Sequence, residues 1–343
     1  DIVEGEAGLD WQAYWDSGSE GLVQFDGSET FAFEPGRGFW LTGQSAWEDQ
    51  SEHTAIELDR PDGRVAVPLH DGWNIVSNPM GMDLDWAAVE ALNEGSFQPI
   101  WAFNGAFSEA ETLGSAMSGE AYYFLNDGGL DELVLQAGEE QPEPPSETPG
   151  VTTPDTDPLI SMAATLVDRP DVTSTVQLGV TESSVTAAPL VGPPSAFEAV
   201  SLRIQPDANQ VAASEETQSP LMRSQRTMSG EGETFTLTLR TQAEGPVEIR
   251  FSDLTALNGR EAALLHPSAG TTYDLSTNST VTLEPDSDEI TLRVAIGTQA
   301  FVDGAVDEVL PTELTLTAYP NPVQSQATVQ YTLTEAEDVR FEV

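Results

Sequence analysis

Few side chains in this sequence have the types and the spacing that catalysis or zinc binding requires. The three histidines, His53, His70 and His266, lie far apart, and no His-x-x-x-His or His-Glu-x-x-His pattern occurs. There is no cysteine to supply a thiolate and no Gly-x-Ser-x-Gly elbow to present a serine nucleophile. The sequence therefore predicts neither an enzyme nor a zinc protein.

Paired carboxylates are the remaining candidates for metal binding. Asp83 and Asp85, and likewise Asp286 and Asp288, are separated by a single residue, which could bring two oxygen ligands together. Neither pair belongs to an Asp-x-Asp-x-Asp-Gly loop with a distal Glu, the pattern of a calcium-binding hand. Because the chain holds 58 acidic residues, such pairs arise by chance. We therefore expect no cofactor, with calcium as the alternative.

Aromatic side chains offer one further kind of chemistry, which is stacking on a ligand such as a sugar ring. Trp15 and Trp47 each lie among Asp, Glu, Ser and Gly, outside any alternating pattern, and are the candidates for ligand stacking. Other aromatic residues lie in short apolar stretches. We expect these to fill the core, because aromatic rings dominate core energetics in small domains: Phe39, Trp40, Tyr122 and Tyr123.

The charge of the chain restricts its partners. Its 58 acidic residues outnumber 12 basic ones, all arginine, which gives a formal net charge of −46. Such a charge repels nucleic-acid phosphates and anionic lipid, so we expect neither nucleic-acid nor membrane-surface binding. It is typical of a halophile-type surface that stays soluble in concentrated salt, or of an acidic secreted protein. No apolar run approaches the ~18 residues that span a bilayer, so no transmembrane segment is predicted.

Residues 1–135 are rich in aromatic residues and contain an internal duplication. Each copy ends in a segment that we name the closer, in which a glycine-containing turn precedes large aromatic residues. The two closers are residues 35–41 (Pro-Gly-Arg-Gly-Phe-Trp-Leu) and 118–124 (Ser-Gly-Glu-Ala-Tyr-Tyr-Phe). In the first closer, Gly36 and Gly38 predict a turn and a close approach of the backbone to its neighbours.

The second copy also has an opener, residues 72–79, which we expect to be a strand ended by Asn-Pro. A short helix is predicted over residues 83–92, with an aspartate available as N-cap. The opener of the first copy would lie before Asp1, so we expect the chain to begin inside a repeat.

Two further segments follow the duplication. Residues 136–158 combine proline with Glu, Thr, Ser and Asp, and predict a stiff acidic linker. Residues 159–309 predict an antiparallel β-sandwich, because apolar and polar residues alternate in short runs. Within it, residues 205–233 are polar, and we expect a mobile excursion between strands. The alternating runs are residues 176–180, 200–204, 235–239, 247–251, 281–283 and 290–296.

The C-terminal segment, residues 310–343, has the most specific pattern. Pro320 and Pro322 exclude a helix and predict an extended lead-in formed by residues 319–322. The residues that follow alternate in polarity over 327–333, and again over 339–343 after an acidic turn. We expect these two strands to pair as a hairpin with one buried face.

This segment resembles the opening of the type A C-terminal sorting domain carried by cargo of the bacterial type IX secretion system. That family has a Tyr-Pro-Asn-Pro lead-in, an apolar-x-Tyr-x-Leu strand, a short acidic turn and a Val-x-Phe/Leu-x-Val strand. The chain stops at Val343, whereas the family domain continues with further strands, so we expect the domain to be truncated here. The residues that carry the sorting motif are Tyr319, Pro320, Asn321, Pro322, Tyr331 and Leu333.

The resemblance implies a location and a partner. We expect a non-catalytic C-terminal region of a secreted or cell-surface protein, which the type IX secretion machinery exports. Alternatives are a carbohydrate-binding or adhesive module that uses the aromatic repeats, with surface polysaccharide as partner, or the tail of an exported enzyme whose catalytic domain lies upstream. The expected fold is mainly β, with tandem aromatic-rich β units, a β-sandwich and the first strands of a second, Ig-like β domain.

Overall fold

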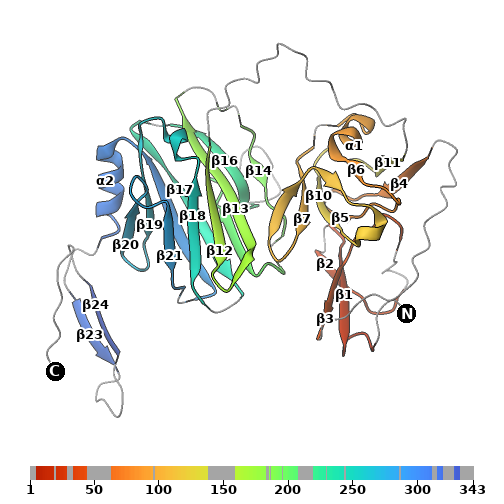
Figure 1. The fold of residues 1–343 in the computed structure, drawn as a ribbon, viewed down its shortest axis with the longest axis horizontal. Coiled ribbons are helices and arrows are strands. Elements are labelled where there is room, and N and C mark those ends of the chain that lie inside the picture. Colours follow the sequence, from red (N-terminus) through yellow and green to blue (C-terminus); the bar gives the residue numbers. More distant parts are fainter. Residues whose placement is uncertain are drawn as a thin grey trace. The chain divides into compact units, whose positions relative to one another are not determined.

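The computed structural model describes most of the chain. The described residues are 5–18, 21–28, 34–44, 63–95, 97–137, 159–182, 185, 187–194, 196–207, 219–228, 230–242, 245–285, 287–310, 315–319 and 328–332. The chain divides into two compact units, residues 1–151 and 152–343, and both are mainly β as predicted (Figure 1). The predicted linker, apart from its first two residues, lies outside the described part.

The first unit consists of small antiparallel sheets. A three-stranded sheet has the order β2-β1-β3 and is formed by β1 (Trp11–Asp16), β2 (Leu22–Gln24) and β3 (Trp40–Gly43). A four-stranded sheet has the order β5-β10-β7-β8 and is formed by β5 (Gly72–Val76), β7 (Ile100–Phe103), β8 (Phe107–Ala110) and β10 (Tyr122–Asn126). Two strand pairs complete the unit: β4 (Arg64–Pro68) with β11 (Glu132–Gln136), and β6 (Leu84–Asp85) with β9 (Thr112–Leu113).

The two predicted copies share one strand order. In both copies, the first strand (β1 or β7) lies between the second strand (β2 or β8) and the strand of the closer (β3 or β10). The orders are β2-β1-β3 and β8-β7-β10. Trp40 lies opposite Tyr14 in the first copy, and Tyr123 lies opposite Trp101 in the second. The registers differ, because Trp101 lies opposite the closer residue Tyr123 whereas Trp11 lies opposite Gly43.

The predicted opener and helix of the second copy are present. The opener forms β5, which ends before Asn78-Pro79, and helix α1 (Trp86–Leu92) follows with Asp85 as its N-cap. The Asp85 carboxylate accepts a hydrogen bond from the backbone N–H of Ala88 at 3.1 Å, which satisfies one of the donors left open at a helix start.

The core of the first unit lies between helix α1 and the sheets. The Phe124 ring is fully buried and meets the rings of Trp86 and Phe97 edge to face, at 5.6 and 5.3 Å between centroids. Such edge-to-face pairs contribute about 0.5–1.5 kcal/mol each beyond area burial. Leu84 and Val89 complete this cluster with other apolar side chains of β9, β10 and β11.

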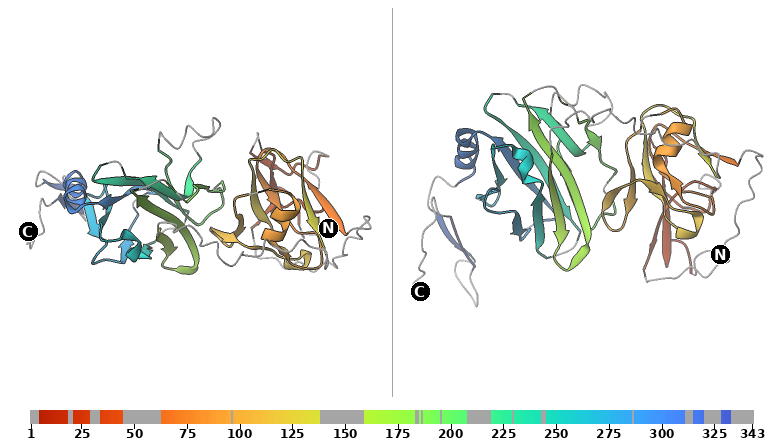
Figure 2. Two further views of the ribbon diagram at one scale, coloured as in Figure 1. Left: turned by 90° about the horizontal axis from the view of Figure 1, so that it is seen from above. Right: turned by 45° about the horizontal axis from the view of Figure 1, so that its top comes forward.

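The second unit is built on one large sheet of eleven strands (Figures 1 and 2). Its strands are β12 (Ile160–Leu166), β13 (Arg169–Thr181), β14 (Leu190–Val191), β15 (Val200–Ile204), β16 (Leu221–Thr227), β17 (Gly232–Thr241), β18 (Val247–Ser252), β19 (Glu261–His266), β20 (Thr271–Asp274), β21 (Thr280–Leu283) and β22 (Glu289–Gly297). The main path has the order β20-β19-β22-β17-β15-β16-β13-β12-β18-β21, with β14 beside β16. Each predicted alternating run falls within one of these strands.

This sheet corrects the prediction of an antiparallel sandwich of separate sheets. Strands β13 and β16 are parallel, with Gln177 opposite Arg223, so the sheet is mixed. The half of the sheet from β20 to β15 joins the half from β16 to β21 through one pair of β15 and β16, Ile204 opposite Leu221. Strand β15 also contacts β12 and β13, so the sheet curves back on itself and is nearly closed. Alternation in the sequence could not distinguish these arrangements, because parallel and antiparallel strands share the period of two.

The prediction of a mobile excursion over residues 205–233 is wrong for residues 221–233, which contain β16 and the start of β17. The sequence of strand β16 is polar, yet several of its polar side chains are buried and form hydrogen bonds. Arg226 lies with its guanidinium 4.4 Å from the Phe235 ring centroid and donates to the Thr234 carbonyl oxygen at 3.0 Å. Gln225 accepts the backbone N–H of Ala187 at 2.9 Å. Residues 208–218 lie outside the described part.

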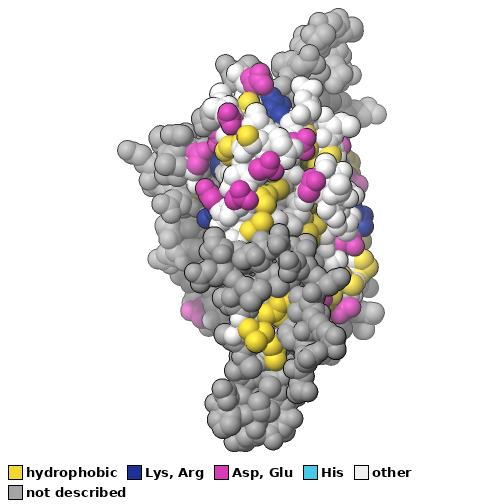
Figure 3. All heavy atoms as spheres, turned by 90° about the vertical axis from the view of Figure 1, so that its left-hand side faces the viewer, with side chains coloured by type: hydrophobic (Ala, Val, Ile, Leu, Met, Phe, Trp, Pro, Cys, Tyr) yellow, Lys and Arg dark blue, Asp and Glu magenta, His cyan; other side chains and the backbone are white. Residues whose placement is uncertain are grey.

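The second unit also contains a helix that the all-β prediction lacks. Thr298 is the N-cap of helix α2 (Gln299–Asp307), and its hydroxyl accepts a hydrogen bond from the backbone N–H of Phe301 at 3.3 Å. Val302 is buried against Leu265, in a cluster with Ala263 and Ala295 of β19 and β22. The helix therefore covers one end of the curved sheet (Figure 1). The face drawn in Figure 3 carries many acidic and few basic side chains, in agreement with the composition.

Candidate functional site

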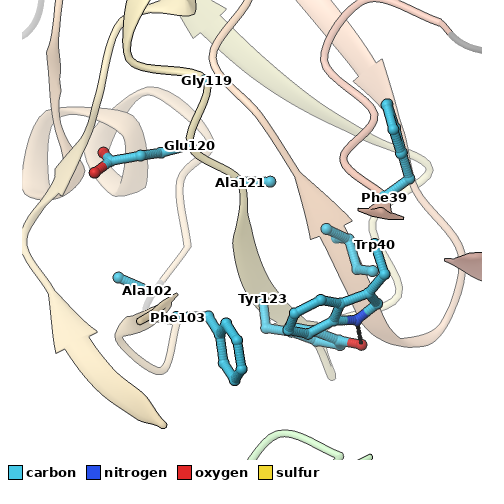
Figure 4. Close-up of a pocket in the computed structure, with 9 residues that line it drawn as sticks. Phe39, Trp40, Ala102, Phe103, Gly119, Glu120, Ala121 and Tyr123 are labelled. Carbon is cyan, nitrogen blue, oxygen red and sulfur yellow. Dashed lines mark hydrogen bonds between the residues drawn. The ribbon is translucent and has the colours of Figure 1, made fainter. Parts of the chain in front are cut away.

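A pocket of about 240 Å³ opens in the first unit where parts of both copies meet (Figure 4). Phe39 and Trp40 come from the first closer, and Ala121 and Tyr123 from the second. The wall is completed by Phe103 at the end of β7, together with Ile75, Ala102, Gly119 and Glu120. Strands β7 and β10 are in register only at Trp101 and Tyr123. This pair lies beside the N-terminal end of β10, where the pocket lies.

The rings that line the pocket are in mutual contact. The centroids of Trp40 and Phe103 lie 4.5 Å apart with the rings almost perpendicular, and Trp40 lies 6.2 Å from Tyr123. The indole Nε1 of Trp40 donates a hydrogen bond to the Tyr123 hydroxyl at 3.0 Å (Figure 4). Tyr122 and Tyr123 are buried, as predicted for core residues. Phe39 and Trp40 are only half-buried, so they lie at the rim of the core, which was expected of tryptophan and tyrosine tips but not of Phe39.

The glycines of the first closer bring its backbone against β5, as predicted. Gly36 has φ of 86°, a left-handed conformation that turns the chain. The N–H of Gly38 donates to the Ile75 carbonyl oxygen at 2.8 Å, and the N–H of Ser77 donates to that of Gly36 at 2.8 Å. A Cβ on Gly38 would lie 2.7 Å from the Cβ of Ala121 and closer still to Ile75. Glycine is therefore required for the two closers to approach.

Among the described residues of the pocket wall, no charged side chain faces the rings. The Glu120 carboxylate accepts a hydrogen bond from the Tyr122 hydroxyl at 2.7 Å, and points away from Trp40 and Tyr123 (Figure 4). Burial, with the nearby Glu120, raises the pKa of Tyr122 to about 12. Burial also raises the pKa of Tyr123, so both phenols stay protonated at neutral pH.

Beside the pocket, an unexpected group of polar side chains connects the two copies. Burial raises the pKa of Asp16 above its ordinary 3.8, while the Gly18 N–H and His70 oppose that rise. The His70 ring has its Nε2 2.9 Å from the Asp16 carbonyl oxygen and its Nδ1 3.0 Å from that of Asp71. His70 therefore connects the end of β1 with the turn before β5.

The asparagines of the opener have a structural role that the sequence did not reveal. Asn74 accepts the His70 backbone N–H at 3.0 Å and donates to the carbonyl oxygens of His70 and Gly72. Asn78, which precedes the proline, donates to the carbonyl oxygens of Met82 and Leu113. Both side chains are buried, so they satisfy backbone groups that would otherwise lack partners.

Of the two residues predicted to stack on a ligand, the structure describes one. Trp15 is half-buried in β1, and the Arg37 guanidinium lies 4.3 Å from its ring centroid. A ligand could stack on that face only after Arg37 had moved. Trp47 lies outside the described residues.

Of the two carboxylate pairs considered for calcium, the first forms local hydrogen bonds, and only one member of the second belongs to the described residues. Asp85 caps helix α1, and Asp83 accepts the backbone N–H of Ser115 at 2.8 Å. Asp288 is exposed, and Asp286 lies outside the described part. Among the described residues, no group of three or more His, Cys, Asp or Glu could hold a metal ion.

The C-terminal segment contains a second candidate site, a hairpin of β23 (Thr315–Tyr319) and β24 (Thr328–Thr332). We name it the C-terminal hairpin. Leu316 lies opposite Tyr331, and Ala318 opposite Val329. Leu316, Val329 and Tyr331 share one face, since side chains alternate along a strand. Leu316, Val329 and Tyr331 are 64%, 45% and 43% exposed, so this apolar face is open to solvent.

The hairpin adds a strand that the sequence analysis did not predict. The described partner of β24 is β23, and the predicted pairing with residues 339–343 lies outside the described residues. Tyr319 is the last residue of β23, in agreement with an extended lead-in, and Tyr331 lies in β24. Pro320, Asn321, Pro322 and Leu333 of the sorting motif lie outside the described residues, as do residues 339–343.

No helix in the described part of the chain has both the length and the apolar character needed to cross a bilayer. Comparisons of the chain with protein-family models, with curated proteins and with solved structures find no match.

Proposed function

We propose that the chain is the non-catalytic C-terminal region of a secreted or cell-surface protein, and that the segment from Leu310 onward addresses it to the type IX secretion machinery. In this account the C-terminal hairpin provides the first strands of an Ig-like sorting domain. The preceding units act as a scaffold on the outer cell surface or in the medium.

The observation that carries this proposal is the open apolar face of the C-terminal hairpin. A two-stranded hairpin alone is marginally stable in water and needs further strands or a partner against one face. Leu316, Val329 and Tyr331 provide such a face, and the sorting motif specifies an apolar residue at position 329 and a tyrosine at position 331. The hairpin shares no hydrogen-bonded pairing with the large sheet in the described part of the chain. The hairpin is therefore suited to recognition by another protein.

A reporter-export experiment tests the proposal. A periplasmic fluorescent reporter is fused to the native C-terminal region from Leu310 onward and expressed in a host that has the secretion system. We expect the reporter in the medium or on the cell surface, and in the periplasm when the secretion pore is deleted.

Substitutions separate recognition from general secretion. Tyr331→Ser and Leu316→Ser remove apolar side chains from the open face, and we expect the reporter to remain in the periplasm. Gln330→Ser, at the position between Val329 and Tyr331 in the same strand, is the matched control and should be exported. Export that is equal for all three variants would refute the role of the hairpin.

A further inference from the structure

The pocket between the two closers differs from the core beside it in the exposure of its rings. Phe107 and Phe124 are 1% and 0% exposed, whereas Phe39, Trp40 and Phe103 are only half-buried. Burial of apolar surface stabilises by about 25 cal/mol per Å², so rings left partly in water forgo stabilisation that a bound molecule could supply. A concave site with aromatic walls and few polar groups is the usual form of a small-molecule site.

The charge around the pocket selects a neutral ligand. Among the described residues that line the pocket, Glu120 is the one acidic residue, and its carboxylate points away from the rings (Figure 4) and accepts from the Tyr122 hydroxyl. None of these described residues is an arginine, and the chain has a formal net charge of −46, so an anion would be repelled. Asp16 lies near enough to Tyr123 to help raise its pKa, but the Asp16 carboxylate accepts the Gly18 N–H at 2.9 Å.

The Tyr123 hydroxyl supplies a hydrogen-bond donor at this site. It accepts the Trp40 indole N–H at 3.0 Å and keeps its own hydrogen for a second bond. No acceptor for that hydrogen is recorded among the described residues. A purely apolar ligand would leave this donor unsatisfied, at a cost of about 1–3 kcal/mol. A ligand with both C–H faces and oxygen acceptors satisfies the rings and the hydroxyl together.

We propose that this pocket binds a neutral pyranose unit of a polysaccharide, with the C–H face of the sugar against Trp40 and Phe103 and a sugar oxygen accepting from Tyr123. The small side chains of Ala102 and Ala121, with Gly119, leave room for the ring in the pocket. This site is distinct from the stacking positions predicted at Trp15 and Trp47, and it does not depend on the proposed export.

Binding to the full chain tests the inference. Short neutral oligosaccharides of glucose, mannose, galactose and N-acetylglucosamine are titrated by calorimetry and by tryptophan fluorescence. The fluorescence reports on the first unit alone, because all seven tryptophans precede residue 48 or lie between 73 and 101. We expect at least one oligosaccharide to bind with a change in fluorescence.

Three variants locate the site. Phe103→Ala removes a half-buried ring from the wall and should weaken binding at least about tenfold. Tyr123→Phe removes the hydroxyl and keeps the ring, and should weaken binding roughly 2- to 10-fold, the range of one neutral hydrogen bond. The matched control is Phe25→Ala, a half-buried phenylalanine of the same unit that stacks on Trp11 and does not line the pocket. Its affinity should be unchanged.

Several results would overturn the inference. These are the absence of binding to every neutral oligosaccharide, equal weakening in all three variants, or binding of a proline-rich peptide of residues 139–158 in place of any sugar. The melting temperature of each variant is measured in parallel, so that loss of the fold is distinguished from loss of the site.

Discussion

The replacement of Gly38 by alanine tests whether the two closers meet as closely as the structure places them. The added Cβ would lie 2.7 Å from the Cβ of Ala121 and closer still to Cγ2 of Ile75. Neither neighbour is the end of a flexible side chain, so the backbone itself must shift. Inserting a methyl group into a packed site costs about 1–3 kcal/mol. For a unit of this size each kcal/mol lowers the melting temperature by about 2–4 °C, so the expected decrease is about 2–12 °C.

The assay is thermal unfolding followed by tryptophan fluorescence, which reports on the first unit because residues 152–343 contain no tryptophan. The matched control is Gly81→Ala, where a Cβ would meet nothing within 4 Å. There the loss of chain entropy in the unfolded state should raise stability by about 0.4–1 kcal/mol. If Gly38→Ala melted at or above the temperature of Gly81→Ala, the close approach at Ile75 and Ala121 would be refuted.

Three further predictions concern charge. Burial raises the folded-state pKa of Asp16 above 3.8. The contribution of Asp16 to the free energy of unfolding is therefore greatest below pH 3.8 and falls as the pH rises through the folded-state pKa. Asp16→Asn should therefore be more stable than wild type at pH 7, and chemical denaturation should find a difference that shrinks toward pH 4. Arg203→Met leaves the buried Glu198 without its counter-charge at 2.5 Å and should cost the second unit about 3–5 kcal/mol by circular dichroism. The double variant with Glu198→Gln should recover most of that loss, and failure to recover would contradict a charge effect. Finally, self-repulsion among 46 excess negative charges should weaken as the Debye length falls from ~10 Å at 0.1 M to ~3 Å at 1 M salt, so melting temperatures should rise with sodium or potassium chloride. A flat response would refute the halophile-type surface.

Much of the strand content could be predicted from the sequence, because alternation directly reflects half-buried strands. The runs at 235–239 and 290–296 became β17 and β22, which pair over nine residues with Leu237 opposite Leu292. Strand β16 was missed because alternation marks apolar burial, whereas its interior positions include Arg226, Ser224 and Gln225. Only the bonds of these side chains to Thr234, Ala187 and other neighbours make their burial possible.

The pocket could be predicted in its parts but not as a site. The glycine turn and the aromatic residues of the closers are evident in the sequence, but Trp40 and Tyr123 are separated by 83 positions. Their hydrogen bond depends on how the two copies meet, and no local pattern contains that information. For the same reason the sequence could not distinguish the half-buried Trp40 from the buried Tyr123.

The C-terminal hairpin illustrates a similar limit. The alternation of residues 327–333 predicted β24 and its apolar face, and Val329 and Tyr331 do share a face with Leu316. The pairing of β24 with β23 was not predicted, because pairing between strands is a long-range property that alternation within one strand does not contain.

The most direct test of the proposed function is to remove the segment from Leu310 to the natural C-terminus in the producing cell and to locate the protein. We predict that the shortened protein accumulates in the periplasm with its tryptophan fluorescence unchanged, because the first unit folds without the C-terminal hairpin. The unaltered protein should appear outside the outer membrane. Secretion of the shortened protein at the level of the unaltered one would contradict the claim that this segment is the export address.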